Sequence, residues 1–185
     1  MNILIFEGIA TSGKSTLMEG LQNEVNGLVK LVGEPETHIP IMHETEKLHE
    51  QFFIDLIEKC VAAKPDLLIF DRLYLTQAFR AHASLSQYPD VEDLLKRCNA
   101  RIVFLKVQEE AIKERIQKAA EHRDVSWKDY IWTKGDTPEG IAQYYIQQQR
   151  HQLKLLESST LPHNTFNTTD HDYKQITKEI IGLLQ

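Results

Sequence analysis

Residues 8–16 read Gly8-Ile9-Ala10-Thr11-Ser12-Gly13-Lys14-Ser15-Thr16. The first eight of them fit the pattern GxxxxGK[ST] without a mismatch, directly after a short apolar run and at the start of a helical pattern. The glycines let the backbone turn so that several N–H groups point at a phosphate, and the helix that follows adds partial positive charge. A chance glycine turn with a solvated lysine is the alternative, which the position of the motif disfavours. The stretch therefore predicts a loop that binds the phosphates of a nucleoside triphosphate.

The side chains of this loop suit a triphosphate that carries magnesium. Lys14 would supply a mobile cation to the β- and γ-phosphates, and the Ser15 hydroxyl is a ligand for Mg²⁺. We therefore expect ATP and Mg²⁺ as the cofactors. The residues expected to contact the nucleotide are Gly8, Ile9, Ala10, Thr11, Ser12, Gly13, Lys14, Ser15 and Thr16.

Short apolar runs alternate with longer helical patterns along the rest of the chain, which is typical of βαβ units and a parallel sheet. The expected strands are residues 3–6, 28–32, 67–70, 101–107 and 164–167. The expected helices run from the loop to about residue 26, then over about 44–63, 109–122, 137–157 and 173–184. The pattern predicts an α/β three-layer sandwich with five short parallel strands, formed by a single domain over residues 1–185.

Asp71 and Arg72 directly follow the third expected strand. In a parallel sheet they lie at the C-terminal edge beside the phosphate loop, where a P-loop enzyme keeps a carboxylate that positions Mg²⁺. Arg72 would face the same crevice and pair with a phosphate or with the acceptor. A surface ion pair after a core strand remains the alternative.

Glu34 ends the second expected strand, at the same edge of the sheet, and is followed by Pro35. Its carboxylate could accept a proton from an attacking hydroxyl. It could equally cap a turn that Pro35 fixes. The residues themselves leave both interpretations open.

A polar segment follows the fourth expected strand and its helix. Residues 119–136 contain aromatic side chains among polar ones and predict a lid that closes over phosphates, with a packed surface loop as the alternative. The run Gln147–Gln149 is expected on an exposed helix face. So is a row of basic side chains at helical spacing, for which a solvated face is the usual explanation: Arg115, Lys118, His122 and Arg123.

The composition limits the classes of partner that we expect for this protein. The net charge of −6 argues against a nucleic-acid partner, because proteins that track phosphate backbones usually cluster Lys and Arg. No apolar stretch approaches the roughly 20 residues that span a bilayer, and residues 3–6 are too short for a signal peptide, so we expect a cytoplasmic protein with no membrane partner. Cys60 and Cys98 lie in no metal or redox motif.

With these motifs in place, the chain resembles the thymidylate kinase and deoxynucleoside kinase group of P-loop kinases. Residues Phe6–Thr16 are similar to the FEGxxGxGKST start of that group, and Asp71–Arg80 to the DRY…S…AYQ segment of thymidylate kinases. Leu105–Val107 and Glu114–Ile116 are similar to the LDV…ERI strand and helix. The likeness covers nearly the whole chain, although only the first motif is specific by itself. It implies the P-loop NTPase fold, a strand order of 2-3-1-4-5 and enzymes that are commonly homodimers.

The positions at which this chain differs from these families bear on which acceptor it binds. Thymidylate kinases usually carry Asp inside the loop, where this chain has Ala10, and Arg before Glu-Pro, where it has Gly33. No arginine lies between Glu34 and Glu58, so an acceptor monophosphate would lack the bidentate partners those enzymes place there. Deoxynucleoside kinases lack the loop carboxylate and use the Glu of Glu-Pro as base, which favours Glu34. They carry Glu-Arg-Ser where this chain has Asp71–Leu73, so the sequence lies between the two patterns.

The resemblance implies transfer of a γ-phosphoryl group from ATP to a small nucleoside-type acceptor, either a nucleoside or a nucleoside monophosphate. Lys14 would hold the phosphates, Glu34 would orient or deprotonate the acceptor, and Arg72 with a lid arginine such as Arg123 would neutralise charge in the transition state. The alternative is a P-loop ATPase or nucleotide-dependent switch that acts on a protein partner. No second acidic residue follows Asp71 to activate a water, and no NKxD motif is present, which disfavours this alternative.

Overall fold

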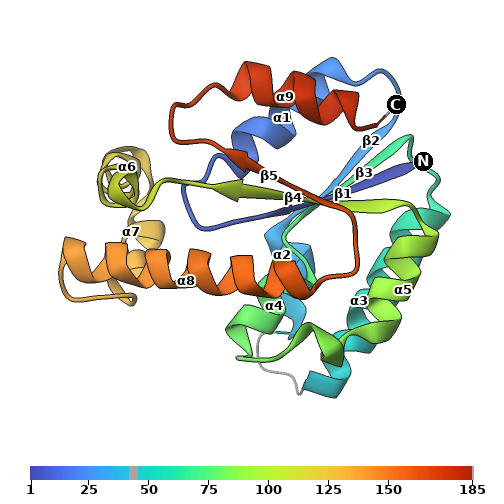
Figure 1. Ribbon diagram of the computed structural model, residues 1–185, viewed down its shortest axis with the longest axis horizontal. Coiled ribbons are helices and arrows are strands. Elements are labelled where there is room, and N and C mark those ends of the chain that lie inside the picture. The colour runs from blue at the N-terminus through green and yellow to red at the C-terminus, as the bar shows by residue number, and fades with distance from the viewer. Residues whose placement is uncertain (42–45, 185) are drawn as a thin grey trace.

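The computed structural model describes residues 1–41 and 46–184, without the side chains of residues 46 and 47. Its centre is a parallel sheet of five strands in the order β2-β3-β1-β4-β5 (Figure 1). This confirms the predicted architecture and strand order. The strands are β1 (Asn2–Glu7), β2 (Val29–Val32), β3 (Leu67–Asp71), β4 (Ala100–Lys106) and β5 (His163–Asn167).

Helices cover both faces of the sheet (Figure 1). One layer consists of α1 (Lys14–Glu24) and α9 (Tyr173–Gly182), which pack on each other. Beyond the opposite face lie α2 (Glu34–Thr37), α3 (Glu46–Ala62), α4 (Tyr74–Arg80), α5 (Pro89–Arg97) and α8 (Pro138–Ser158). At the carboxyl end of β4, α6 (Glu109–His122) and α7 (Val125–Trp132) extend the molecule to one side.

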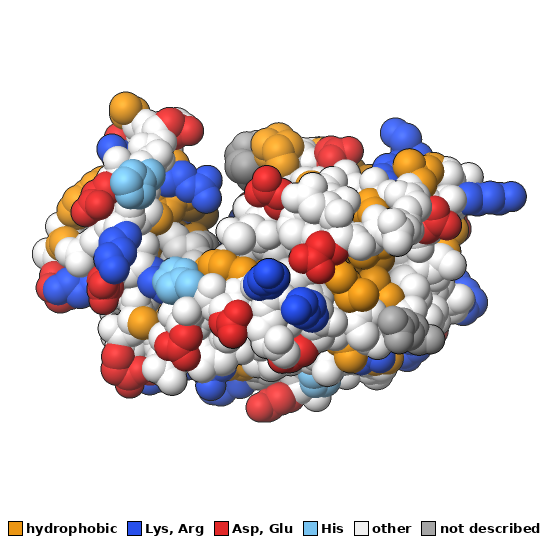
Figure 2. Space-filling view, turned by 90° about the horizontal axis from the view of Figure 1, so that it is seen from above, with side chains coloured by type: hydrophobic (Ala, Val, Ile, Leu, Met, Phe, Trp, Pro, Cys, Tyr) orange, Lys and Arg blue, Asp and Glu red, His pale blue; other side chains and the backbone are white. Residues whose placement is uncertain are grey.

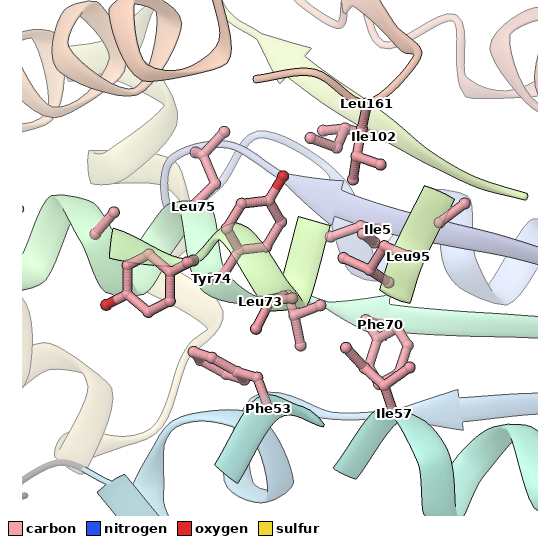
Figure 3. Close-up of a cluster of buried hydrophobic side chains, with 14 of the residues drawn as sticks. Ile5, Phe53, Ile57, Phe70, Leu73, Tyr74, Leu75, Leu95, Ile102 and Leu161 are labelled. Atoms are coloured by element: carbon pink, nitrogen blue, oxygen red, sulfur yellow. The ribbon is translucent and has the colours of Figure 1, made fainter. Parts of the chain in front are cut away.

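The three central strands β1, β3 and β4 are largely apolar because both of their faces are buried. Along β1, Leu4 and Phe6 belong to the cluster beneath α1 and α9, while Ile3 and Ile5 belong to the larger cluster on the other face. Figure 3 shows this larger cluster, in which Phe70 of β3 lies next to Ile57 of α3. The alternation places two cores back to back, with the sheet as a rigid base for the loops at its carboxyl edge.

Some elements differ from the sequence prediction. The helix expected from about residue 44 begins at Glu46, and residues 44 and 45 lie outside the described part of the chain. Helices α2, α4 and α5 were not predicted at all. The α4 helix is short, so its periodicity is weak, whereas α5 carries a clear N-terminal signal in Pro89, with Asp90 and Glu92 in its first turn.

The predicted exposed face at Gln147–Gln149 was wrong for two of its three residues, because Gln148 and Gln149 are buried. Gln149 in α8 donates from Nε2 to the carbonyl oxygen of Val107 at 2.8 Å and accepts from the Val107 N–H at 2.9 Å. Val107 lies just past β4, where the ladder of the sheet ends. The amide of Gln149 therefore replaces the backbone partners that the strand no longer offers.

We expect Gln149→Leu to lower the free energy of unfolding by about 2–4 kcal/mol, because it leaves the N–H and C=O of Val107 buried without partners. Urea unfolding followed by circular dichroism would measure the loss. Gln143→Leu, at an exposed position of the same helix, is the matched control and should change stability by under about 0.5 kcal/mol. Equal effects of the two substitutions would contradict the role of the Gln149 amide.

None of the helices in the described part of the chain combines the length and apolar character that crossing a bilayer requires.

Candidate active site

A cleft of about 750 Å³ lies at the carboxyl edge of the sheet. Figure 2 shows a hollow between the side of the molecule that carries α6 and α7 and the remainder, with basic side chains near it. Gly8 and Ile9, the first two residues of the loop, do not line this cleft. The cleft brings together the other predicted site residues: Ala10, Thr11, Ser12, Gly13, Lys14, Ser15, Thr16, Glu34, Asp71, Arg72 and Arg123.

The two glycines of the loop occupy backbone conformations that favour glycine. Gly8 has φ +136° and Gly13 has φ +94°. A Cβ at Gly8 would lie 2.5 Å from the carbonyl oxygen of Leu105, and one at Gly13 would lie 2.3 Å from Cε1 of Tyr173. Gly13 is also the N-cap of α1, and no side chain caps that helix. The first amide groups of α1 are thus available to a phosphate.

Lys14 is buried at the base of the loop. Its Nζ donates to the carbonyl oxygens of Gly8 at 3.2 Å and Ile9 at 3.1 Å. Burial, with the nearby charge of Arg72, lowers the pKa of Lys14 to about 7. Several oxygens of a bound triphosphate would replace this small set of carbonyl partners and favour the charged form.

Glu7, which the sequence analysis did not single out, is a fully buried carboxylate at the end of β1. It accepts hydrogen bonds from the Leu73 N–H at 2.9 Å, the Thr76 N–H at 3.3 Å and the Thr76 hydroxyl. Burial raises the pKa of Glu7 despite these donors. The carboxylate holds the first turn of α4 and so fixes the turn at Arg72, which has φ +66°. A charged residue ending an apolar strand was the only signal in the sequence.

Arg72 is buried and joins the loop to Glu34, which contradicts the alternative of a surface ion pair. Its Nη1 donates to the carbonyl oxygen of Gly8 at 3.0 Å, and its Nε lies 3.2 Å from Oε2 of Glu34. The other carboxylate oxygen of Glu34 accepts from Nη2 of Arg80. Burial alone would raise the pKa of Glu34, but Arg72 and Arg80 outweigh it and lower this pKa to about 2. The carboxyl of Glu36, and not that of Glu34, caps the turn at Gly33.

The residues near Asp71 fit a magnesium ion that is held mainly by phosphates. The Oδ1 atom of Asp71 is buried with no hydrogen-bond partner, and the exposed Ser15 lines the same cleft. The described residues contain no group of three or more His, Cys, Asp or Glu side chains that could hold a metal. Mg²⁺ typically binds one or two protein oxygens together with substrate phosphates and water. Ser15 and Asp71 match that pattern.

The basic row on α6 lines the cleft, so a purely solvated face was the wrong interpretation for part of it. Arg115 is buried and donates from Nη1 to the carbonyl oxygen of Thr168 at 2.8 Å, and from Nη2 to the hydroxyl of Tyr173 at 2.5 Å. Lys118 is exposed and pairs with Glu114, as the i, i+4 spacing predicts. The row makes one wall of the cleft basic in a protein of net charge −6.

A segment after β5 completes the cleft and was missed by sequence analysis. Thr168 donates from Oγ1 to the carbonyl oxygen of Ser12 at 2.8 Å, and the ring of Tyr173 lies against Gly13. Thr169 and His171 also line the cleft. A polar loop between a strand and a helix carries no pattern that would have revealed these contacts.

The predicted lid, residues 119–136, contains helix α7. Ile131 is buried in a cluster with residues of α6 and α8. Trp127 lines the cleft, and the guanidinium of Arg123 lies 5.8 Å from the centroid of its ring. One part of the segment is thus anchored and another part faces the loop. Its closure over a nucleotide stays a prediction.

Comparisons with known proteins bear on the fold. No protein-family model and no curated protein matches the chain. Among solved structures, the chain is similar to the YorR protein from Bacillus subtilis in complex with phosphorylated GDP, with 19% identity, a TM-score of 0.67, and coverage of 98% of this chain and 95% of that one.

Two further solved structures are similar over their full length. Shikimate kinase from Bacteroides thetaiotaomicron is 14% identical with a TM-score of 0.58, and deoxyadenosine kinase from M. mycoides with bound dCTP is 17% identical with a TM-score of 0.55. Each match covers 100% of this chain and 98% of the other. With its sheet order, helical layers and glycine loop, this chain has the fold of the P-loop kinases.

Proposed function

We propose that this chain is an ATP- and Mg²⁺-dependent kinase that moves the γ-phosphoryl group to a nucleoside or a nucleoside monophosphate in the cytoplasm. The observation that carries the proposal is the convergence of Lys14, Asp71 and Arg72 with the uncapped start of α1 on one cleft. The fold neighbours include a deoxyadenosine kinase with bound dCTP and a protein with phosphorylated GDP, which supports a nucleotide ligand.

Each residue has a role in the proposed reaction. Lys14 and the loop amides hold the β- and γ-phosphates, while Ser15 ligates Mg²⁺ and Asp71 positions it. When bound, the ion supplies charge neutralisation at the phosphates. Arg72, beside the carbonyl of Gly8, stabilises charge that develops on the transferred group. Glu34 sets the position of the acceptor.

The segment 119–136 acts as a lid in this proposal. Arg123, at the C-terminus of α6, faces the cleft and would approach the triphosphate when the segment closes. A lid of this kind excludes water and so protects ATP from hydrolysis.

We expect ATP consumption to depend on an acceptor. With Mg²⁺ and ATP alone the rate should be low, and adding the right acceptor should raise it at least about 100-fold. Coupled ADP release across a panel of nucleosides and nucleoside monophosphates, with product analysis by chromatography, measures this. Steady ATP hydrolysis that no acceptor changes would contradict the proposal and favour an ATPase or switch with a protein partner.

A further inference from the structure

The seam between α2 and α4 carries a ladder of polar contacts beside the cleft. Glu34 and His38 are spaced by four residues, and they meet Arg80 and Gln77, spaced by three, on the facing helix. His38 donates from Nδ1 to Oε1 of Gln77 at 3.3 Å, and Gln77 donates from Nε2 to Nδ1 of His49 at 3.2 Å. Burial and the nearby arginines lower the pKa of His38 to about 3, so His38 is neutral. The positive charge of the seam comes from arginine.

Arg80 was not predicted as a site residue, yet it supplies a second guanidinium next to that of Arg72. The side chain of Arg80 is 34% exposed, and that of Glu34, which lines the cleft, is 38% exposed. The sequence comparison left a monophosphate acceptor without bidentate partners because no arginine precedes the third strand. The fold provides one from the helix after that strand instead.

The same contacts engage both oxygens of the Glu34 carboxylate. Oε1 accepts from Arg80, and Oε2 pairs with Arg72. The two arginines also lower the pKa of Glu34 to about 2, which makes its carboxylate a weak base for an acceptor hydroxyl. Among the described residues that line the cleft, the other carboxylates are Asp71, which the proposed function assigns to Mg²⁺, and Glu114, which pairs with Lys118 on α6. At this edge of the cleft, Glu34 thus lies between two guanidinium groups that suit an anion, and each carboxylate that lines the cleft has a partner or an assigned role.

We infer that Arg80 binds the phosphate of the acceptor together with Arg72, and that the acceptor is a nucleoside monophosphate and not a nucleoside. Arg72 contacts both the loop and Glu34, so it can serve the acceptor phosphate as well as the transferred group. This inference rests on the proposed kinase function. Glu34 is then a positioning residue, which holds the two guanidinium groups in place while no acceptor is bound. Guanidinium groups match the bidentate geometry of a phosphate, which a single hydroxyl does not offer.

The chemistry of such an acceptor removes the need for a base. The second ionisation of a phosphate monoester has a pKa of about 6, so its oxygen is already negative at neutral pH. That oxygen forms a bond to the γ-phosphorus of ATP, and the bond from this phosphorus to the β–γ bridging oxygen breaks. The products are ADP and a nucleoside diphosphate, with no proton transferred.

The test compares three panels of acceptors with wild-type protein, ATP and Mg²⁺: the monophosphates AMP, GMP, CMP, UMP and dTMP, their nucleosides, and the hydroxy acid shikimate. We expect transfer to at least one monophosphate and to none of the hydroxyl acceptors. Transfer to a nucleoside or to shikimate, with none to a monophosphate, would overturn the inference and leave the kinase proposal standing. ATP turnover that no panel changes would refute the kinase proposal itself.

Variants then test whether Arg80 binds the phosphate of the acceptor. Arg80→Ala should raise the KM for the monophosphate about 10- to 100-fold while the KM for ATP stays within about twofold, and Arg80→Lys should recover part of the loss. Arg150→Ala is the matched control, because Arg150 also pairs with a glutamate, Glu109, but that glutamate does not line the cleft as Glu34 does. An unchanged acceptor KM in Arg80→Ala would overturn the inference.

Glu34→Gln separates a positioning role from that of a base. Removing a general base typically costs about 10²- to 10⁴-fold in kcat. With an ionised acceptor, Glu34→Gln should instead keep kcat within about tenfold of wild type and change mainly the acceptor KM. A loss of kcat beyond 100-fold, with folding intact, would show that Glu34 removes a proton and would overturn the inference.

Discussion

Replacement of Lys14 by alanine is expected to lower the rate of phosphoryl transfer at least about 10³-fold, because Lys14 is the cation that the loop itself supplies to the β- and γ-phosphates. The expected effect is on catalysis and not on folding. Lys14 is buried with carbonyl partners only, at 3.2 and 3.1 Å, and its pKa is lowered to about 7. Steady-state kinetics with saturating acceptor would measure the loss, and Lys96→Ala, which removes an exposed partner of Asp93, is the control.

The lowered pKa also sets the sign of the effect on stability. A lysine whose folded pKa lies below its unfolded pKa near 10.5 destabilises the fold most below about pH 7, and this cost disappears as the pH rises to 10.5. The free energy of unfolding of Lys14→Ala, relative to that of wild type, should therefore be higher at pH 6 than at pH 10. Urea unfolding at both pH values measures the difference. Normal transfer by the variant, or a stability difference of the opposite sign, would contradict the assignment.

Gly8→Ala is expected to lower the free energy of unfolding by about 2–5 kcal/mol. A side chain at φ +136° is strained, and its Cβ would lie 2.5 Å from the carbonyl oxygen of Leu105, a backbone atom that cannot rotate away. Because Leu105 belongs to β4 and Gly8 follows β1, relief requires the two strands to separate. Chemical denaturation measures the loss, and nucleotide binding should fall with it.

Gly182→Ala is the matched control for that substitution. A Cβ at Gly182, at the end of α9, would meet no atom within 4 Å. Alanine in a helix is favoured over glycine by roughly 0.5–1 kcal/mol, so this variant should be as stable as wild type or more stable. If Gly8→Ala also proved neutral, the loop conformation at Gly8 would be wrong.

The parts of the fold that could be predicted are those with strong local signals. Apolar runs predicted the central strands β1, β3 and β4. The Thr137-Pro138 start of α8 was also predicted, and Thr137 accepts from the Gly140 N–H at 3.0 Å. The α4 helix had no such signal, because Glu7, distant in sequence, holds its first turn. The burial of Gln149 was hidden for the same reason, since its partner is a strand end and not a neighbour in the helix.

The candidate site also contains residues that the sequence could reveal and residues that only the fold reveals. The loop, Asp71 and Glu34 were found because motif and strand end coincide in sequence. Arg80 reaches the site from the last turn of α4 and Tyr173 from the first turn of α9, and neither matches a motif residue, so only the fold brings them there. The roles of these residues in catalysis stay predictions until the variants are measured.

The contacts of Thr168 and Tyr173 with the phosphate loop have a consequence for how the protein is made. Thr168 bonds to Ser12 across 156 residues of sequence. Contacts that join distant parts of a chain form late, since the loop between them must first be closed. During synthesis, the loop near the N-terminus therefore leaves the ribosome early but acquires its final support only after β5 has been added. Nucleotide that binds the finished loop would then stabilise the completed chain and not its unfinished precursors.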